Sequence, residues 1–381
     1  MSERQIVVIG AGQSGLSAAL SLKDVGLDPL VLERTDAVAS AWRGRYDRLK
    51  LNTWRAHSHL PDRPFPKGTP TFPSRDQVVQ HLERHAAEEG LEFRFGTEVE
   101  RIDRDGGRWL VTTREGDVRS PQVVVATGYE NDPFIPDWPG RDRFDGELLH
   151  ARDYRRPAPY AGKRVLVVGP GCTGMEIAFD LAEAGAGKVW LAARTPPNIL
   201  LRQGPAGVPG DVIGSALLHT PVRFADWFAN FGRRMDVGDL TEHGLPVPDE
   251  GVFSRMYRLG VAPAIIDKEI LGAIKSGAIE IVRGVESLDP RTVALADGTT
   301  VEPDAIICAT GYRRGLEPLV GHLDVLGERG VPRALGPKPA ASGLRFIGYV
   351  PRPGGLGYMA KEAKRAAKAI KGELASAPVA A

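Results

Sequence analysis

The chain has 381 residues, with 49 Lys and Arg against 48 Asp and Glu, for a formal net charge of +1. This balance gives no electrostatic basis for binding nucleic acid or an anionic membrane. The length suffices for two domains, no apolar run approaches the ~18 residues of a membrane span, and the first predicted strand begins without a secretory signal. The two cysteines, Cys172 and Cys308, predict buried thiols rather than disulfides. We therefore expect a soluble cytoplasmic protein.

A glycine-rich loop follows the first apolar strand. After residues 6–9 (Ile-Val-Val-Ile) the chain reads Gly10-Ala11-Gly12-Gln13-Ser14-Gly15, followed by a predicted helix over residues 14–25 and a strand over residues 29–32 that ends at Glu33. In this strand–loop–helix pattern the helix N-terminus binds a pyrophosphate. A carboxylate at the end of the second strand accepts hydrogen bonds from a free ribose diol. The segment predicts a site for FAD.

The same pattern recurs in the middle of the chain. A predicted strand over residues 164–168 leads into Gly169-Pro170-Gly171-Cys172-Thr173-Gly174, and the strand after the next helix, residues 189–193, ends at Arg194. A guanidinium at this position would pair with a 2′-phosphate. The second loop therefore predicts a site for NADPH, and the two loops together suggest hydride transfer onto a flavin.

Two similar segments follow buried strands and mark where the chain crosses between domains. They are Ala126-Thr127-Gly128 and Ala309-Thr310-Gly311. We predict an α/β fold with two Rossmann-like dinucleotide-binding domains, the NADPH domain inserted into the FAD domain. The expected limits are 1–155 for the first part of the FAD domain, 156–309 for the NADPH domain with a helical insertion at about 203–263, and 310–381 for the second part.

The remaining elements follow from local patterns. Ser74 and Gln77 predict a capping box that opens a helix ending near Gly90. Predicted strands cover residues 92–95, 99–103, 109–113 and 123–126, and predicted helices cover 222–231 and 265–275. A last strand over 344–349 leads through 354–357 into a final helix, whose N-terminus should help complete the FAD site. The tail after Lys371 should fray.

One motif narrows the class of protein. Residues 144–154 (Phe-Asp-Gly-Glu-Leu-Leu-His-Ala-Arg-Asp-Tyr) fit F-x-G-x-x-x-H-x-x-x-Y just before the second glycine loop. This segment resembles the fingerprint of the class B flavoprotein monooxygenases, and residues 309–312 (Ala-Thr-Gly-Tyr) resemble another segment of that family. The middle and C-terminal parts are most similar to the plant YUCCA-type branch. Arg155 follows Tyr154, whereas the Baeyer–Villiger branch usually carries Trp at the aromatic position.

The resemblance implies a specific chemistry. NADPH would reduce the flavin, NADP⁺ would stay bound, and O₂ would add at flavin C4a to give a hydroperoxide that must be kept from water. One oxygen atom would then enter a small organic substrate, by N or S oxygenation or by oxidative decarboxylation of a 2-oxo acid such as indole-3-pyruvate. Asn52 resembles the family's Asn over flavin and NADP⁺, and an amide can donate and accept at once. His150 is implied to lie beside NADPH, with a linker histidine bonded to backbone as the alternative. Asn52 and His150 are the catalytic candidates.

Other functions remain open at this stage: Baeyer–Villiger oxygenation, an NADPH oxidase or pyridine nucleotide-dependent reductase, and a non-catalytic redox sensor. The lack of C-x-x-C argues against a dithiol relay. The histidines His57, His59, His81 and His85 predict no metal site. We expect no nucleic-acid or membrane partner and a possible homodimer. The candidate cofactor-binding residues are Gly10, Gly12, Gln13, Ser14, Gly15, Glu33, Arg34, Trp42, Leu51, Asn52, Val99, Ala126, Thr127, Gly128, Gly169, Gly171, Cys172, Thr173, Gly174, Arg194, Thr195, Thr310, Gly311, Tyr312, Gly348 and Gly357.

Overall fold

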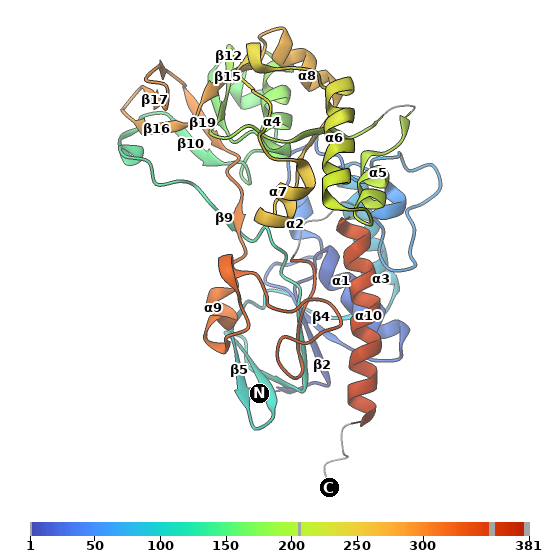
Figure 1. Ribbon diagram of the computed structural model, residues 1–381. Coiled ribbons are helices and arrows are strands. Elements are labelled where there is room, and N and C mark those ends of the chain that lie inside the picture. The colour runs from blue at the N-terminus through green and yellow to red at the C-terminus, as the bar shows by residue number, and fades with distance from the viewer. Residues whose placement is uncertain (1, 205–206, 350–354, 377–381) are drawn as a thin grey trace. The chain divides into compact units, whose positions relative to one another are not determined.

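The chain has a mixed α/β fold that divides into two compact units (Figure 1). The computed structural model describes residues 2–204, 207–349 and 355–376. Unit 1 comprises the described residues of Met1–Arg43, Trp54–Asp132 and Tyr312–Ala381, and unit 2 comprises those of Gly44–Thr53 and Pro133–Gly311. Each unit is built on its own parallel sheet of five strands.

The parallel sheet of unit 1 has the order β21-β8-β2-β3-β4. Its strands are β2 (Ile6–Ile9), β3 (Leu30–Leu32), β4 (Glu92–Arg94), β8 (Gln122–Val125) and β21 (Leu344–Phe346). All neighbours run parallel. Strands β2, β3, β8 and β21 are wholly buried, and β2 and β3 are accordingly apolar throughout. The polar residues of the other two, Gln122 in β8 and Arg345 in β21, are bonded to each other at 2.9 Å. Helices α1 (Gln13–Asp24) and α10 (Gly355–Ser376) run side by side in this unit.

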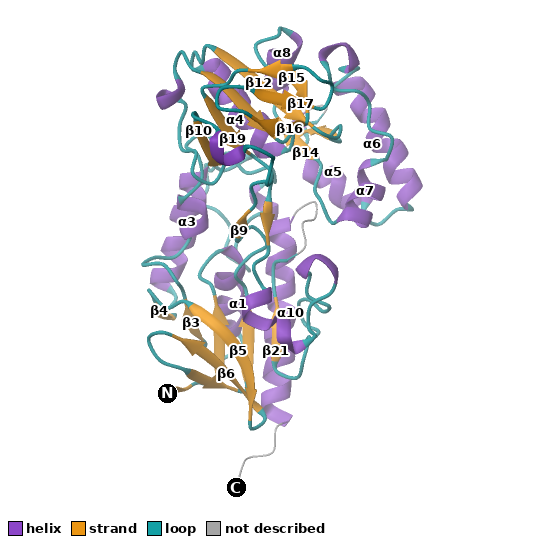
Figure 2. Ribbon diagram, turned by 90° about the vertical axis from the view of Figure 1, so that its left-hand side faces the viewer, coloured by secondary structure: helices purple, strands orange, loops and turns teal. Residues whose placement is uncertain are grey.

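A second sheet completes unit 1. It is ordered β1-β7-β6-β5 and contains β1 (Ser2–Glu3), β5 (Val99–Asp105), β6 (Arg108–Thr113) and β7 (Val118–Ser120). Figure 2 shows β5 and β6 as a long pair. The sequence pattern missed β1 and β7, because strands of two and three residues carry too few side chains to show a period. The other helices of the unit are α2 (Ser40–Arg43), α3 (Arg75–Glu88) and α9 (Glu317–Val320).

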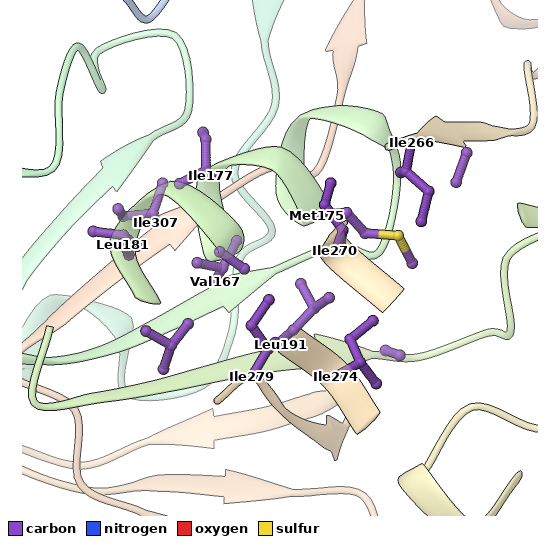
Figure 3. Packing of buried hydrophobic residues seen from close by; sticks show 14 of the residues in the cluster. Val167, Met175, Ile177, Leu181, Leu191, Ile266, Ile270, Ile274, Ile279 and Ile307 are labelled. Atoms are coloured by element: carbon purple, nitrogen blue, oxygen red, sulfur yellow. The ribbon is translucent and has the colours of Figure 1, made fainter. Parts of the chain in front are cut away.

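Unit 2 contains a parallel sheet of order β10-β19-β11-β12-β15. Its strands are β10 (Glu147–His150), β11 (Arg164–Val168), β12 (Lys188–Ala193), β15 (Glu280–Arg283) and β19 (Ala305–Cys308). Helices α4 (Cys172–Glu183) and α8 (Lys268–Lys275) pack on it, and Met175, Ile177 and Leu181 meet Val167, Leu191 and Ile307 in the core (Figure 3).

Smaller elements of unit 2 surround this sheet. Antiparallel strands β16 (Val285–Leu288), β17 (Val293–Leu295) and β18 (Thr300–Val301) form one group. Strand β13 (Ile199–Leu201) pairs with β14 (Ala264–Ile266). Within the predicted insertion lie α5 (Gly210–Leu217), α6 (Val222–Asp236) and α7 (Val252–Leu259), grouped together in Figure 2.

Several predicted boundaries differ from the structure. The longer segment of unit 2 begins at Pro133 rather than at 156, because β10 pairs with β19 and so joins that sheet, and unit 2 also takes in Gly44–Thr53. The predicted helix over 265–275 is strand β14 followed by α8, because Ala264–Ile266 pair with β13 and the helix starts only at Lys268. Helix α10 continues past Lys371 to Ser376, and the rest of the predicted frayed tail lies outside the described residues.

The predicted start of helix α3 is confirmed. Ser74 and Gln77 form the expected capping box of α3. The chain passes between the units at Arg43/Gly44, Thr53/Trp54, Asp132/Pro133 and Gly311/Tyr312, whereas the sequence predicted crossings at residues 126–128 and 309–311. Strands β9 (Asp132–Pro133) and β20 (Tyr312–Arg313) pair with each other. Over the described ranges, no helix is both long and apolar enough to cross a membrane.

Helix α3 carries a buried histidine that must stay uncharged. His81 is 2% exposed, stacks on Phe65 with ring centroids 4.2 Å apart, and accepts a long hydrogen bond (3.5 Å) from the Leu60 amide at Nε2. Burial, with smaller contributions from His85 and other cations, lowers its pKa to about 3. In the unfolded chain His81 binds a proton with a pKa near the ordinary value for histidine, whereas in the folded protein it stays neutral down to a much lower pH.

We predict that acidification destabilises unit 1 through His81. Lowering the pH from 7 to 5 should reduce the free energy of unfolding by about 2 kcal/mol from this group alone, because the unfolded histidine is protonated there and the folded one is not. Denaturant unfolding of wild type and His81→Leu at both pH values measures it. Glu89, whose pKa is lowered to about 2 mainly by Arg63, stays ionised throughout this interval. An equal pH dependence in wild type and variant would contradict the assignment.

Candidate cofactor and active site

The three glycines of the first loop have different surroundings. Gly10 has φ +100°, and a Cβ there would lie 2.9 Å from the carbonyl oxygen of Ala126. A Cβ on Gly15 would overlap the carbonyl oxygen of Gly10. A Cβ on Gly12 would meet nothing within 4 Å. Gly10 and Gly15 are therefore required by backbone packing, whereas Gly12 leaves the backbone open to a ligand.

The second loop repeats this division. Gly169 has φ +113°, and a Cβ there would overlap the carbonyl oxygen of Ala309. A Cβ on Gly174 would overlap the carbonyl oxygen of Gly169, while one on Gly171 would meet nothing within 4 Å. Gly12 and Gly171 are the N-caps of α1 and α4, and neither helix has a side-chain cap. Both helix N-termini thus offer backbone N–H groups to an anion, which fits a pyrophosphate.

Glu33 lies at the end of β3 and holds the first loop. It is buried, and its Oε2 accepts a hydrogen bond of 2.7 Å from the Ala11 amide. Its Oε1 accepts hydrogen bonds from the amide and hydroxyl of Thr35, at 3.0 and 2.8 Å. A carboxylate has about four acceptor positions, so room remains for one hydroxyl of a ribose diol. Glu33 therefore orders the loop and also fits the free ribose of FAD; Arg34 beside it is exposed.

The C-terminal segment lies against the first loop, and the completion of an FAD site there stays a prediction. Gly348 has φ +86°, and a Cβ there would overlap the Ser14 hydroxyl. Gly357, in the first turn of α10, would place a Cβ 2.6 Å from the carbonyl oxygen of His57. The Ser14 hydroxyl contacts Met359 Sδ at 3.3 Å. The N-terminal turns of α1 and α10 therefore lie together in unit 1.

Arg194 and Thr195 follow β12 and are exposed. The stem of Arg194 packs against Gly284, where a Cβ would lie 3.1 Å from the Arg194 Cβ. The guanidinium thus stands at the carboxyl end of the sheet, where α/β folds bind dinucleotides. This position fits a 2′-phosphate.

Cys172 opens α4 but is not a redox thiol by its surroundings. Burial raises its pKa to about 11, and its Sγ accepts a hydrogen bond of 3.1 Å from the Ile265 amide. Cys308 is fully buried, and burial raises its pKa to about 12. Reactive cysteines have lowered pKa values, so both thiols are structural. The prediction that both are buried is confirmed for Cys308, whereas residue Cys172 as a whole is only partly buried.

His150 ends β10 and is 3% exposed. Its Nδ1 accepts a hydrogen bond of 3.0 Å from the Arg152 amide, so the proton is on Nε2, which lies 3.0 Å from the carbonyl oxygen of Gly311 and donates to it. Burial lowers the pKa of the ring. These contacts favour the alternative of a linker histidine bonded to backbone. His150 ties the segment 144–154 to Gly311 of the second Ala-Thr-Gly segment.

Asn52 belongs to unit 2, not to the first part of the FAD domain where the sequence placed it. Its Oδ1 accepts a hydrogen bond of 3.2 Å from Arg202 Nε. Arg202 also pairs with Glu176 and, at 2.7 Å, with Asp267, and Glu176 accepts a hydrogen bond of 2.5 Å from the Tyr46 hydroxyl. This network of Glu176, Arg202 and Asp267 was not predicted from the sequence, because its members are far apart in the chain and follow no local motif.

The other predicted site residues are distributed over both units. Thr127 contacts the buried Tyr349, whose hydroxyl lies 2.8 Å from its Oγ1 and accepts from its amide at 3.1 Å. Thr310 donates to the carbonyl oxygen of Phe134. Leu51 is buried in unit 2, and Val99 is buried at the start of β5 in unit 1. Gln13 donates a hydrogen bond to the Ser58 carbonyl oxygen, and Gly128 has φ +82°. The remaining predicted residues are Trp42 in α2, Thr173 in α4 and Tyr312 in β20. No group of three or more His, Cys, Asp or Glu side chains is placed to hold a metal ion in the described part of the chain.

Comparison with known proteins identifies the family. The pattern of the flavin-binding monooxygenase-like family matches residues 3–320. Indole-3-pyruvate monooxygenase YUCCA1 of Oryza sativa subsp. japonica is 37% identical over 96% of this chain and 90% of its own length. Among solved structures, a flavin-containing monooxygenase from Stenotrophomonas maltophilia covers 98% of this chain and 100% of its own, at 23% identity and a TM-score of 0.74. The bacillithiol disulfide reductase Bdr of Bacillus cereus covers 98% of this chain and 100% of its own, at 18% identity and a TM-score of 0.70.

The structural neighbours include an oxygenase and a reductase, so they establish the mixed α/β fold and not the reaction. The sequence relatives decide the class. The chain belongs to the flavin-binding monooxygenase-like family, and it is a flavin monooxygenase, an oxidoreductase with FAD and NADPH as its cofactors. The resemblance stated from the motifs, including the YUCCA-type branch, is confirmed.

The two outer positions of each glycine triple should respond differently from the middle one. Gly15→Ala should be destabilised by about 3 kcal/mol or fail to fold, because the new Cβ overlaps backbone. Gly12→Ala should have a free energy of unfolding within about 1 kcal/mol of wild type. It should bind FAD more weakly, because its Cβ projects into the open side of the loop. Unfolding curves and the flavin absorbance per polypeptide measure the two effects. Equal flavin content in Gly12→Ala and wild type would contradict this division.

Proposed function

We propose that unit 1 binds FAD and unit 2 binds NADPH, as two Rossmann-like domains of which the second is inserted into the first. The observation that supports this most is the repeated loop geometry with different residues at the ribose position. Both loops have two glycines held by backbone and a middle glycine open to a ligand. Glu33 follows one loop and Arg194 the other, so one site suits a free ribose and the other a ribose phosphate.

We propose that the substrate is a small 2-oxo acid with an aromatic side chain, such as indole-3-pyruvate. The sequence relative with 37% identity is named for this substrate and matches almost the whole chain. Reduced FAD, when bound, supplies the activation of O₂ and the transfer of one oxygen atom. The balance is one 2-oxo acid, one NADPH, one proton and one O₂ consumed, with one shortened carboxylic acid, one CO₂, one NADP⁺ and one water formed.

We assign the following roles to the chain's own residues. The N-termini of α1 and α4 bind the two pyrophosphates. Asn52 presents its side-chain amide toward the reacting groups. His150 ties the end of β10 to the backbone of Gly311 and Arg152. A cytoplasmic location and a homodimer stay predictions.

Product analysis tests the reaction. Purified FAD-loaded protein should consume NADPH, O₂ and indole-3-pyruvate in equal amounts and release the acid with one carbon fewer and CO₂. Hydrogen peroxide equal to the NADPH consumed, with no oxygenated product from any 2-oxo acid, amine or sulfide, would instead indicate an NADPH oxidase. The simple ketone cyclohexanone serves as the comparison substrate for Baeyer–Villiger oxygenation.

Arg194 should determine the choice of nicotinamide cofactor. Arg194→Ala should lower the ratio of kcat/KM for NADPH to that for NADH by roughly 10- to 150-fold, because one charge-assisted pair with the 2′-phosphate is lost. The NADH value is the internal control and should stay within a factor of about two of wild type, since NADH has no group at this position. An unchanged ratio in steady-state kinetics would remove Arg194 from the site.

Asn52 should affect coupling rather than cofactor binding. Asn52→Ala should retain bound FAD and reduction by NADPH, but release most of the oxygen as hydrogen peroxide, because the amide that stabilises the oxygen-transferring state is missing. The measurement is the ratio of product to NADPH consumed, with a peroxide assay in parallel. Normal coupling in the variant would show that Asn52 lies outside the active site.

A further inference from the structure

The side chain of Arg202 is 97% buried and donates hydrogen bonds in three directions. It follows β13, where its amide donates to the Ile266 carbonyl oxygen at 2.8 Å and its own carbonyl accepts from the Gly210 amide at 2.9 Å. The backbone on both sides is thus fixed by β14 and by the start of α5. A buried guanidinium costs several kcal/mol unless its N–H groups are satisfied, so its three partners define one orientation.

Two of these partners are carboxylates. Nη2 pairs with Glu176, which is 9% exposed and lies on α4, and Nη1 pairs with Asp267, the N-cap of α8, at 2.7 Å. The planar fork of an arginine matches several acceptors at fixed angles, which the ammonium of a lysine does not. Glu176 is held in turn by the Tyr46 hydroxyl. Helices α4 and α8 therefore set the plane of the guanidinium.

The third partner is Asn52, and the contact determines which end of its amide faces outward. Arginine has only donors, so the Asn52 atom 3.2 Å from Nε must be the carbonyl oxygen. The NH₂ group then points away from Arg202. The hydrogen bond from Arg202 turns the oxygen of Asn52 toward Arg202, so the side of the amide facing away from Arg202 carries the two N–H donors.

We propose that Arg202 is a positioning residue that fixes the amide of Asn52, so that Asn52 acts as a hydrogen-bond donor toward an acceptor atom of the cofactors or of the oxygen being transferred. This inference rests on the proposed function only for the destination of the donor. The orientation itself follows from contacts within unit 2. Three side chains of residues 44–53 bond to unit 2: Tyr46 to Glu176, Arg48 to Glu183, and Asn52 to Arg202. Glu176 and Glu183 are both on α4, so the segment that carries Asn52 is anchored to that helix.

The orientation can be measured without turnover, because the chain contains only four asparagines: Asn52, Asn131, Asn198 and Asn230. Selective labelling of asparagine with ¹⁵N gives four side-chain NH₂ signals in the FAD-loaded protein, and Asn52→Asp identifies that of Asn52. Arg202→Lys should shift or broaden the Asn52 signal and leave those of Asn131 and Asn230 in place. Arg48→Met is the matched control: it removes an arginine that anchors the same segment to the same helix without a contact to Asn52. Its Asn52 signal should match wild type.

Coupling provides the second readout. Arg202→Lys should raise the ratio of hydrogen peroxide to product about tenfold, the size of one lost charge-assisted hydrogen bond, and Arg48→Met should not. In an Asn52→Ala background the Arg202→Lys substitution should add no further loss, because both changes remove one function. If Arg202→Lys does not fold, Arg202→Gln with Glu176→Gln removes both buried charges together.

The outcomes separate this inference from the proposed function. An unshifted Asn52 signal in folded Arg202→Lys, or additive losses of coupling in the double variant, would overturn the positioning role. A wild-type protein that makes no oxygenated product while the Asn52 signal still responds to Arg202→Lys would overturn the proposed function and leave the orientation intact.

Discussion

Each glycine loop depends on a backbone approach that no side chain permits. The carbonyl oxygen of Gly10 occupies the place where a Cβ of Gly15 would stand, and Gly169 and Gly174 repeat the arrangement. This contact brings the first turn of α1 against β2, and that of α4 against β11. The helix N-termini then end at uncapped backbone N–H groups beside an open middle glycine. Buried strands lie beneath both loops, so the two phosphate sites that we propose would depend on packing more than on any charged side chain.

The two sites differ where the strand after each loop ends. Glu33 is buried and bonded to its own loop, whereas Arg194 is exposed and backed by Gly284. A buried carboxylate bonded to three donors orders backbone and selects hydroxyl groups, and an exposed guanidinium recruits a phosphate. The segment with Asn52 is anchored by ion pairs and hydrogen bonds within unit 2. Asn52, which we propose to act in oxygen transfer, is therefore positioned by unit 2, the unit that we assign to NADPH.

The two glycine loops, the strands and helices around them and the start of α3 were predictable from the sequence. Glycine spacing, strand–helix alternation and the capping box at Ser74 are local signals. The motif around His150 gave the family in the same way. The hydrogen bonds of His150 itself, the burial of Arg202 among Glu176, Asp267 and Asn52, and the joining of β10 to β19 were not predictable. They arise from contacts between residues far apart in the chain, which no local period encodes. Strand β14 was mistaken for helix because its three apolar residues fit both periods, and only its pairing with β13 decides between them.

We propose that this one chain binds both dinucleotides and passes a hydride from NADPH to the flavin. An anaerobic titration of the FAD-loaded protein with NADPH tests it most directly. One equivalent of NADPH per bound flavin should bleach the flavin absorbance completely, at a rate well above that with NADH. A flavin band that persists under excess NADPH would rule out hydride transfer from NADPH to the flavin. A band that NADH bleaches as fast would rule out the preference for the phosphorylated dinucleotide.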